Sequence, residues 1–250
     1  MLFDLLNKMR IAQLPESRKL NIQQKKFQNI LEFAQAVLEH SRSKNIYKQY
    51  SSKGNEHPIL DVVRLVGKTT QTKYLTSLIY CNDESELPGI SSGQLFFDQS
   101  IPITNDGKRA YQLMKEEKST KEIQLHKDLI LPWPWKRERL INAISYIGDK
   151  RVRGGWKQDF DNHYTDLWLP IGVTWVNGGN HSIASGIIQG GGTIKPENTF
   201  NISELYKHIF TDGKYYFRKI DNTVIAPVED VEFAAIFEIG RLMIMKGISF

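Results

Sequence analysis

The residues best suited to chemistry lie in the stretch TWVNGGNHSIASGIIQGGG, residues 174–192. A β-branched and aromatic run stops at two adjacent glycines, and small apolar residues then recur at roughly helical spacing, which predicts a strand, a tight turn and a helix start. Paired glycines let backbone N–H groups approach a ligand closely, and the positive end of a helix dipole favours phosphate. The phosphate-binding residues expected in this turn are Gly178, Gly179, Asn180 and Ser182.

The same turn also has a purely structural interpretation. Gly178 and Gly179 would then only supply the positive φ angles of a strand-to-helix connection, and His181 would pack or cap locally. The sequence leaves both interpretations open.

The excess positive charge of the chain lies just before this turn. The net charge is +5, and residues 136–157 carry seven Lys or Arg side chains against two acidic ones, so the rest of the chain is neutral. Such a basic segment favours a nucleotide or a nucleic-acid backbone as partner, although a solvated helix face followed by a loop gives the same pattern. The arginines expected to contact phosphate are Arg137, Arg139, Arg151 and Arg153.

A third group of reactive side chains lies in the loop DFDNHY, residues 159–164. Carboxylate and imidazole groups clustered in this way are typical of divalent-metal sites, so Asp159, Asp161 and His163 are the expected metal ligands. Together with His181, a metal here would indicate a nuclease-like site. The alternative is that the acidic side chains are simply solvated.

Composition limits the classes of protein to which these residues can belong. The chain has 250 residues, of which 40% are hydrophobic and 24% charged, as in ordinary globular proteins. Its single cysteine, Cys81, excludes a disulfide framework and a multi-cysteine metal site, and we expect no haem, flavin or iron–sulfur cluster. No apolar run is long enough to span a membrane, and residues 1–10 do not read as a signal peptide. We therefore expect a soluble, cytoplasmic protein with no membrane partner.

The elements before residue 126 are expected to be mainly helical. Apolar residues at i, i+3 and i+4 spacing predict helices at 22–47 and 59–80. Residues 93–103 are expected to be extended, and residues 109–121 to form a short charged helix. No recognisable motif marks this region, so we expect it to serve homo-oligomerisation or binding of a protein partner.

The character of the sequence changes at residue 126, after which all five tryptophans occur. A strand, a helix and a loop are expected to lead into the glycine turn, and a hairpin and an amphipathic helix to follow it. The methionines of the last helix, Met243 and Met245, are expected in the core. The expected bounds are 129–131 for the first strand, 137–147 for the helix, 151–168 for the loop, 171–176 for the strand before the turn, 202–210 for a helix beyond it, 214–228 for the hairpin and 229–246 for the last helix.

These elements predict an α+β protein in two parts. Residues 1–125 form a mostly helical N-terminal region, and residues 126–250 form a mixed α/β core with a C-terminal hairpin and helix. The division is placed where the helical pattern ends and the Trp- and Gly-rich sequence begins.

The order of strand, turn, basic helix, loop, strand, Gly-Gly-x-His turn and helix across residues 126–193 resembles the ParB/sulfiredoxin-like superfamily. Gly178-Gly179-Asn180-His181 is similar to the Gly-Gly-Cys-His-Arg signature of sulfiredoxins and the Asp-Gly-x-His-Arg signature of ParB-like free-serine kinases, and more distantly to the Gly-Glu-Arg-Arg box of ParB CTPases. The resemblance implies a ParB/sulfiredoxin-like core in an uncharacterised bacterial or phage family. It also implies a bound nucleotide, such as ATP, ADP or CTP, with Mg²⁺.

The sequence departs from these signatures at several positions. Asn180 stands where sulfiredoxins carry the reactive Cys, which argues against sulfinic-acid repair. Ser182 stands where the family usually has an Arg, and this change removes a strong phosphate clamp. Both arginines of the ParB box are absent as well, which argues against a chromosome-partition CTPase. The four arginines of residues 137–153 could supply the missing charge.

Phosphoryl chemistry, if the chain retains it, needs a base and charge compensation. Glu138 occupies a place similar to that of the catalytic acidic residue in ParB-like kinases, and it forms the expected catalytic pair with His181. The alternative for Glu138 is a first-turn carboxylate stabilised by the helix dipole.

Three functions are consistent with these residues. The first is a nucleotide-binding ParB-like protein that transfers a phosphoryl group or hydrolyses a nucleotide or phosphodiester at residues 178–182. The second is a nucleic-acid-binding module in which residues 136–157 follow a backbone and tryptophans stack on bases. The third is a non-catalytic interaction or regulatory protein on a degenerate ParB-like scaffold.

Overall fold

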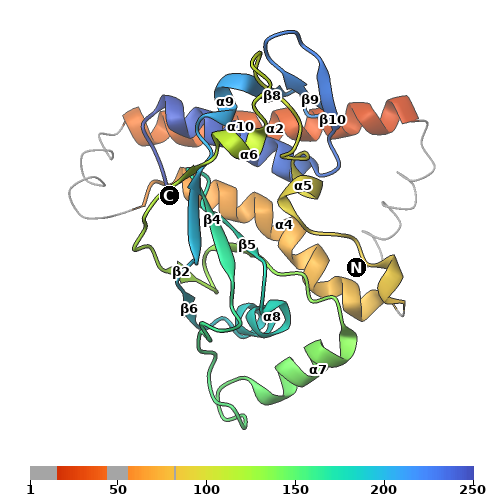
Figure 1. The fold of residues 1–250 in the computed structure, drawn as a ribbon, viewed down its shortest axis with the longest axis vertical. Helices are drawn as coiled ribbons and strands as arrows, with labels where there is room; N and C mark the ends of the chain where they lie inside the picture. Colours follow the sequence, from red (N-terminus) through yellow and green to blue (C-terminus); the bar gives the residue numbers. More distant parts are fainter. Residues whose placement is uncertain (1–15, 44–55, 82) are drawn as a thin grey trace.

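The computed structural model describes residues 16–43, 56–81 and 83–250. It has an α+β fold, with helices first, a mixed sheet next and a long helix near the C-terminal end, as the sequence predicts (Figure 1). No helix in these three ranges is both long enough and apolar enough to cross a bilayer.

Three long helices pack against one another: α2 (Glu16–Ser43), α4 (Ile59–Tyr80) and α10 (Val231–Met245). α10 is apolar on most sides and is buried along most of its length, because α2 and α4 cover it. The predicted helix at 59–80 is confirmed at both ends, whereas residues 44–47 of the first predicted helix lie outside the described residues.

The last predicted helix is also confirmed, and its start is set by a cap. The side chain of Asp230 accepts a hydrogen bond of 2.9 Å from the backbone N–H of Phe233, as an N-cap residue does. Met243 is fully buried in the core as expected, but the expectation for Met245 is wrong, because that side chain is 71% exposed.

A five-stranded mixed sheet in the order β1-β7-β4-β5-β3 leads to the glycine turn. β3 (Leu129–Leu131) runs parallel to β5 (Val173–Val176), and β4 (Thr165–Leu169) lies antiparallel to β5. On its other side β4 pairs with the parallel strand β7 (Asn198–Asn201), and β1 (Lys115–Glu116) lies antiparallel to β7 at the edge.

Two smaller sheets complete the strand pairing. β2 (Ile123–Gln124) pairs with β6 (Thr193–Ile194), and β8 (Ile209–Thr211), β9 (Tyr215–Arg218) and β10 (Val224–Pro227) form an antiparallel sheet. β9 and β10 are the predicted hairpin. Their turn includes Asn222 at φ 54, a left-handed conformation that Asn tolerates better than most residues.

One hydrophobic core draws residues from both sides of residue 125. Phe27 of α2 belongs to the same buried cluster as Trp168 of β4 and Phe237 of α10. Phe96 joins them, since its ring centroid lies 5.9 Å from that of Trp168 and 5.9 Å from that of Phe237. The division at residue 125 stays a prediction, and the packing across it is continuous.

Two elements expected in the first half differ in the structure. Residues 93–103 are not an extended strand, because Ser91 caps one helical turn, α5 (Ser92–Leu95), and the adjacent Phe96 and Phe97 are both buried rather than alternating. The helix expected at 109–121 is limited to α6 (Ala110–Leu113), since the chain then pairs with β7 as β1. A short 3₁₀ turn, η1 (Glu84–Glu86), precedes α5.

Two elements differ in the second half as well. The loop expected at 151–168 ends in β4, a central strand buried on both faces whose sequence therefore lacks polar–apolar alternation. The helix expected at 202–210 is limited to α9 (Leu205–His208), because the next residues pair with β9 as β8. In both cases pairing with a distant strand overrides the local pattern.

The helices around the glycine turn lie far from α2. α7 (Arg137–Tyr146) and α8 (Asn180–Gln189) pack against each other at the opposite end of the molecule from α2 and α10 (Figure 1). The predicted helix at 137–147 is confirmed to within one residue, and the predicted strand at 129–131 is confirmed at both ends.

Candidate functional site

The glycine turn connects β5 to α8 and needs both of its glycines. Gly179 is the N-cap of α8 and has φ 74, in the left-handed region. A Cβ atom on Gly179 would lie 2.2 Å from Cδ2 of His163, and one on Gly178 would lie 2.8 Å from the backbone oxygen of Asn162. The loop around residues 162–164 therefore approaches the turn so closely that any side chain at 178 or 179 would displace it.

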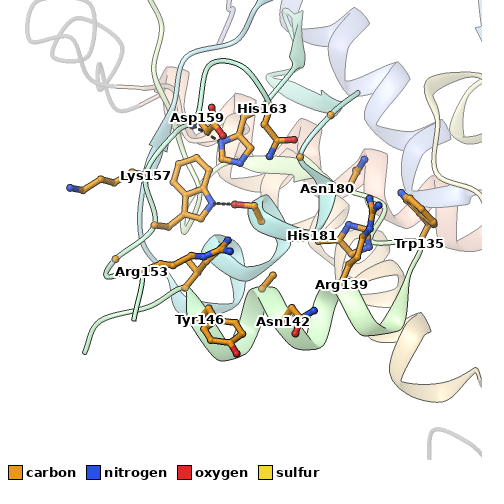
Figure 2. Close-up of a pocket in the computed structure, with 18 of the residues that line it drawn as sticks. Trp135, Arg139, Asn142, Tyr146, Arg153, Lys157, Asp159, His163, Asn180 and His181 are labelled. Atoms are coloured by element: carbon orange, nitrogen blue, oxygen red, sulfur yellow. Dashed lines mark hydrogen bonds between the residues drawn. The ribbon is translucent and has the colours of Figure 1, made fainter. Parts of the chain in front are cut away.

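A pocket of about 570 Å³ lies at the start of α8 (Figure 2). α7, the loop of residues 153–163 and the glycine turn form its walls. The structure thus brings together most of the residues expected at a site. Those that line it are Arg139, Arg153, Asp159, His163, Gly178, Gly179, Asn180, His181 and Ser182.

The start of α8 offers unused hydrogen-bond donors beside this pocket. The first backbone N–H that bonds back into the helix is that of Ile183, which donates to the oxygen of Gly179 at 2.9 Å. The backbone N–H groups of Asn180, His181 and Ser182 form no hydrogen bond with any other described residue. Three such donors and the helix dipole make this end of α8 suitable for an anion.

Three cationic side chains from other elements line the same pocket: Arg139, Arg153 and Lys157. The guanidinium carbon of Arg139 lies 5.1 Å from the ring centroid of Trp135, and that of Arg153 lies 6.0 Å from the ring centroid of Tyr146. Figure 2 shows these two arginine–aromatic pairs beside the start of α8. The pocket therefore combines positive charge with aromatic faces that are partly open to solvent.

The other two arginines expected at phosphate do not line the pocket. Arg151 donates hydrogen bonds to the backbone oxygens of Ile144 and Ile147, and so caps the C-terminal end of α7. Arg137 lies at the first position of α7, two residues before Arg139, and so on a different face of the helix. Of the four expected arginines, the structure places only Arg139 and Arg153 at the site.

His181 is held in a defined protonation state. Its Nε2 atom accepts a hydrogen bond of 3.0 Å from the backbone N–H of Lys136. Burial, and then the charge of Arg139, lower the pKa of His181 below its ordinary value of 6.5. The imidazole is therefore neutral at pH 7, with its proton on Nδ1, and Nε2 is not available as a general base.

Asn180 and His181 together anchor the Pro-Trp-Pro-Trp segment to α8. The side-chain oxygen of Asn180 accepts a hydrogen bond of 2.6 Å from the backbone N–H of Trp133, and His181 holds Lys136 as described above. The ring of Trp135 meets that of His181 edge-on at 5.6 Å. These contacts give the two residues a structural role and bring Trp135 to the pocket.

Glu138 does not join His181 at the pocket. It is exposed in the first turn of α7 and is not among the lining residues. This is the place that a first-turn carboxylate takes when it stabilises the helix dipole. The expected pair of Glu138 and His181 is therefore not assembled around one space.

The expected metal ligands are not gathered into a metal site either. Nδ1 of His163 accepts a hydrogen bond of 2.9 Å from the backbone N–H of Asp159, and its ring stacks on Trp156 at 5.0 Å. Burial lowers the pKa of His163, and the charge of Asp159 opposes this effect. Asp161 does not line the pocket, and no three His, Cys, Asp or Glu side chains in the described ranges could hold a metal ion together.

Several pocket residues were not among the expected site residues. Ser182 accepts a hydrogen bond of 3.1 Å from Nε1 of Trp156, which places that indole at the wall of the pocket. Helical spacing could have found those on α7, because residues 139, 142 and 146 follow one another at three- and four-residue intervals and share a face. The lining residues that were not expected are Trp135, Asn142, Ala143, Tyr146, Ile147, Gly155, Trp156, Lys157, Asn162 and Asn177.

Comparison with known proteins places the chain in a family without assigning it an activity. No curated protein and no solved structure matches it. One family model does, and it covers nearly all of the sequence. The chain belongs to DUF6710, a family of unknown function whose model matches residues 12–250.

Proposed function

We propose that this protein binds a phosphate-bearing small molecule, a nucleotide in the first instance, in the pocket at the start of α8. The observation that carries the proposal is the meeting of three unused helix N–H donors with Arg139, Arg153 and Lys157 around one space. The backbone donors belong to α8, whereas the three cationic side chains come from α7 and the loop after it. A phosphate in the pocket would therefore contact both kinds of donor. Backbone donors fix the position of a phosphate, and arginines add charge-assisted hydrogen bonds.

The aromatic residues of the pocket suit the rest of a nucleotide. Trp135 is 37% exposed and Tyr146 is 46% exposed, so part of each ring is open to solvent. Both rings line the same pocket as the start of α8, so a nucleobase could stack on one of them while its phosphate binds at α8. The volume of about 570 Å³ is of the size that holds small ligands.

The proposed function is binding rather than catalysis. Nε2 of His181 already accepts a hydrogen bond, and Glu138 lies outside the pocket, so neither is placed to accept a proton from a nucleophile. Asp159 is the one carboxylate among the lining residues, and its side chain accepts a hydrogen bond of 3.1 Å from the backbone N–H of Asp161. A protein that senses a nucleotide needs none of these groups as catalysts.

The relation to ParB/sulfiredoxin-like proteins remains part of this proposal. The order β3, α7, β5, glycine turn and α8 agrees with the order expected from the resemblance, and this agreement supports a ParB-like core. β4 enters between α7 and β5, antiparallel to β5. The same motif turn, in a ParB-like core, would be the natural place for phosphate.

Isothermal titration with ATP, ADP, CTP and GTP, each with and without Mg²⁺, tests the proposal. Arg139→Ala and Arg153→Ala should each raise the dissociation constant of the bound nucleotide about tenfold, as expected for a lost hydrogen bond to a charged group. Arg137→Ala, on the same helix but not lining the pocket, is the matched control and should leave the affinity unchanged. Failure of every nucleotide to bind, or an equal loss in the control, would overturn the proposal.

A single-stranded nucleic acid is the second candidate ligand. The observation that favours it is the alternation of aromatic and cationic side chains at the pocket, where Trp135 pairs with Arg139 and Tyr146 pairs with Arg153. Such a ligand would bind more weakly as salt is raised, and more tightly as the oligonucleotide is lengthened. Titration of a mononucleotide and a ten-residue oligonucleotide at two salt concentrations separates it from the nucleotide proposal.

A further inference from the structure

A second surface of the molecule, remote from this pocket, has the features of a protein interface. A groove of about 440 Å³ runs between α2 and α4 on the outside of the molecule. Apolar side chains dominate it, and three of them are strongly exposed: Ile22 at 42%, Phe33 at 57% and Leu65 at 68%. Exposed apolar side chains that cluster over two helices are typical of a surface that another protein covers.

α2 is apolar on two sides, and only one of them is used within the chain. Phe27, Ala34 and Leu38 face the core and are buried against it. Ile22 and Phe33 lie on the opposite side of the helix and line the outer groove. Figure 1 shows α2 lying beside α10, and the exposure of Ile22 and Phe33 shows that this outer side is not covered by the other described residues.

The charges of α2 indicate what covers the groove. Lys25 and Glu32 are both exposed, and neither forms a salt bridge with another described residue. They are seven residues apart, about two helical turns, so they lie on the same flank of the apolar face. If a twofold axis relates two antiparallel copies of α2, each flank of one helix faces the same flank of the other helix, with the order of residues reversed. Lys25 of one copy then faces Glu32 of the partner subunit, twice per dimer.

We propose that the outer face of α2 and α4 is the interface of a homodimer in which the two α2 helices pack antiparallel. The centre of symmetry lies between Lys25 and Glu32, close to Asn29. Asn29 also lines the groove, and near the twofold axis the amide groups of the two copies can hydrogen-bond to each other. An Asn at this position fixes the register of paired helices at some cost in stability.

The antiparallel direction is the one that the charges favour. In a parallel twofold pair, the flank with Lys25 and Glu32 would instead face the other flank of the partner helix, which carries Lys26 and Ile30, so Lys25 and Glu32 would not meet. Lys26 does not oppose the antiparallel arrangement, because it already forms an ion pair with Glu232 in the same chain. The interface thus has self-complementary charge on one flank and apolar contact along its centre.

The first test is the mass of the full-length protein in solution over a range of concentrations, by light scattering after gel filtration and by sedimentation. The wild type should be a dimer. Phe33→Asp should raise the dimer dissociation constant about 100-fold, since a large apolar side chain is lost from the contact face of both copies and replaced by a charge. The matched control is Ile79→Asp, because Ile79 is 61% exposed on α4 but lies outside the groove, and this variant should remain dimeric.

A charge exchange tests the direction of packing. Lys25→Glu and Glu32→Lys should each raise the dissociation constant about tenfold, because each turns two attractions into two repulsions. The double variant restores opposite charges across the axis and should recover the wild-type value. A monomeric wild type, or a dimer that Phe33→Asp does not weaken, would overturn the proposed interface. A double variant no tighter than the single ones would overturn the antiparallel arrangement.

Discussion

At position 179 the surroundings allow only a glycine. Gly179 combines a left-handed φ of 74 with the close approach of His163. The turn therefore has the structural role that one interpretation of the sequence gives it. The same glycines also leave the backbone N–H groups of α8 open to the pocket, so the structural and the binding interpretations are compatible.

Gly179→Ala is expected to lower the free energy of unfolding by about 3 kcal/mol, through left-handed strain and the clash with His163. Gly154→Ala is the matched control, because Gly154 has φ 69 but a Cβ atom at that position would meet no other atom within 4 Å. It should cost about 1 kcal/mol, from backbone strain alone. Urea unfolding of both variants measures the difference. Equal losses would mean that the contact with His163 is not restrictive.

Among the site residues, the sequence identified the turn but not which basic side chains share its pocket. Arg139 and Arg153 reach the pocket, whereas Arg137 lies on another face of the same helix and Arg151 caps its C-terminal end. A charge count treats the four as equivalent. The rotation of α7 against α8 separates Arg139 from Arg137, and the path of the loop after α7 separates Arg153 from Arg151.

Secondary-structure elements were predicted well where the local signals are complete. α4 and β3 have the expected bounds, and α10 begins where Asp230 supplies a cap. β4 was missed because a strand buried on both faces has no alternation to reveal it. β1 and β8 were read as helix because their short pairings with β7 and β9 are contacts between distant parts of the chain.

Asp230 offers a prediction about the start of α10. Its carboxylate accepts hydrogen bonds from the N–H of Phe233 at 2.9 Å and from the hydroxyl of Thr70 at 3.0 Å, so Asp230→Ala should cost about 1–2 kcal/mol of unfolding free energy. Burial, and then the charge of Glu232, raise the pKa of Asp230 above 3.8, so its charge opposes folding at neutral pH. Asp230→Asn keeps an acceptor without the charge.

The Asn variant should therefore be at least as stable as the wild type at pH 7. A raised pKa in the folded state means that the stability contributed by this group is greatest at low pH and decreases as pH rises through its folded pKa. The advantage of Asp230→Asn should accordingly shrink as the pH is lowered toward 4. Denaturant unfolding at pH 4 and pH 7 measures it, and an equal loss in the Ala and Asn variants would contradict the prediction, because the carboxylate charge would then stabilise the fold rather than oppose it.

The molecule is organised around α10, which packs against the first helices and lies in the same core as the central sheet. Phe237 is fully buried, and its ring centroid lies 4.7 Å from that of Tyr206 and 5.9 Å from those of Phe96 and Phe97. Because residues from both sides of position 125 meet at this ring, we expect the two parts to unfold together.

Phe237→Ala should lower the free energy of unfolding by about 3–5 kcal/mol, the cost of a large cavity in a packed core. Ile244→Ala, on the same helix but 37% exposed, should cost much less. Calorimetry of the wild type and both variants gives the comparison. Two separate unfolding transitions in the wild type, of which Phe237→Ala shifts only one, would contradict a core shared by the residues on both sides of position 125.

The sequence by itself determined the fold class, the long helices, the hairpin and the strand–turn–helix around Gly178 and Gly179, because periodicity, caps and glycine pairs act over a few residues. Only the tertiary structure showed that β4 is a central strand, that the expected metal ligands are not gathered at one point, and which residues line the pocket. His163 stacks on Trp156 rather than facing a metal, and His181 holds the backbone of Lys136. These outcomes depend on contacts between segments distant in sequence, and local patterns carry no information about such contacts.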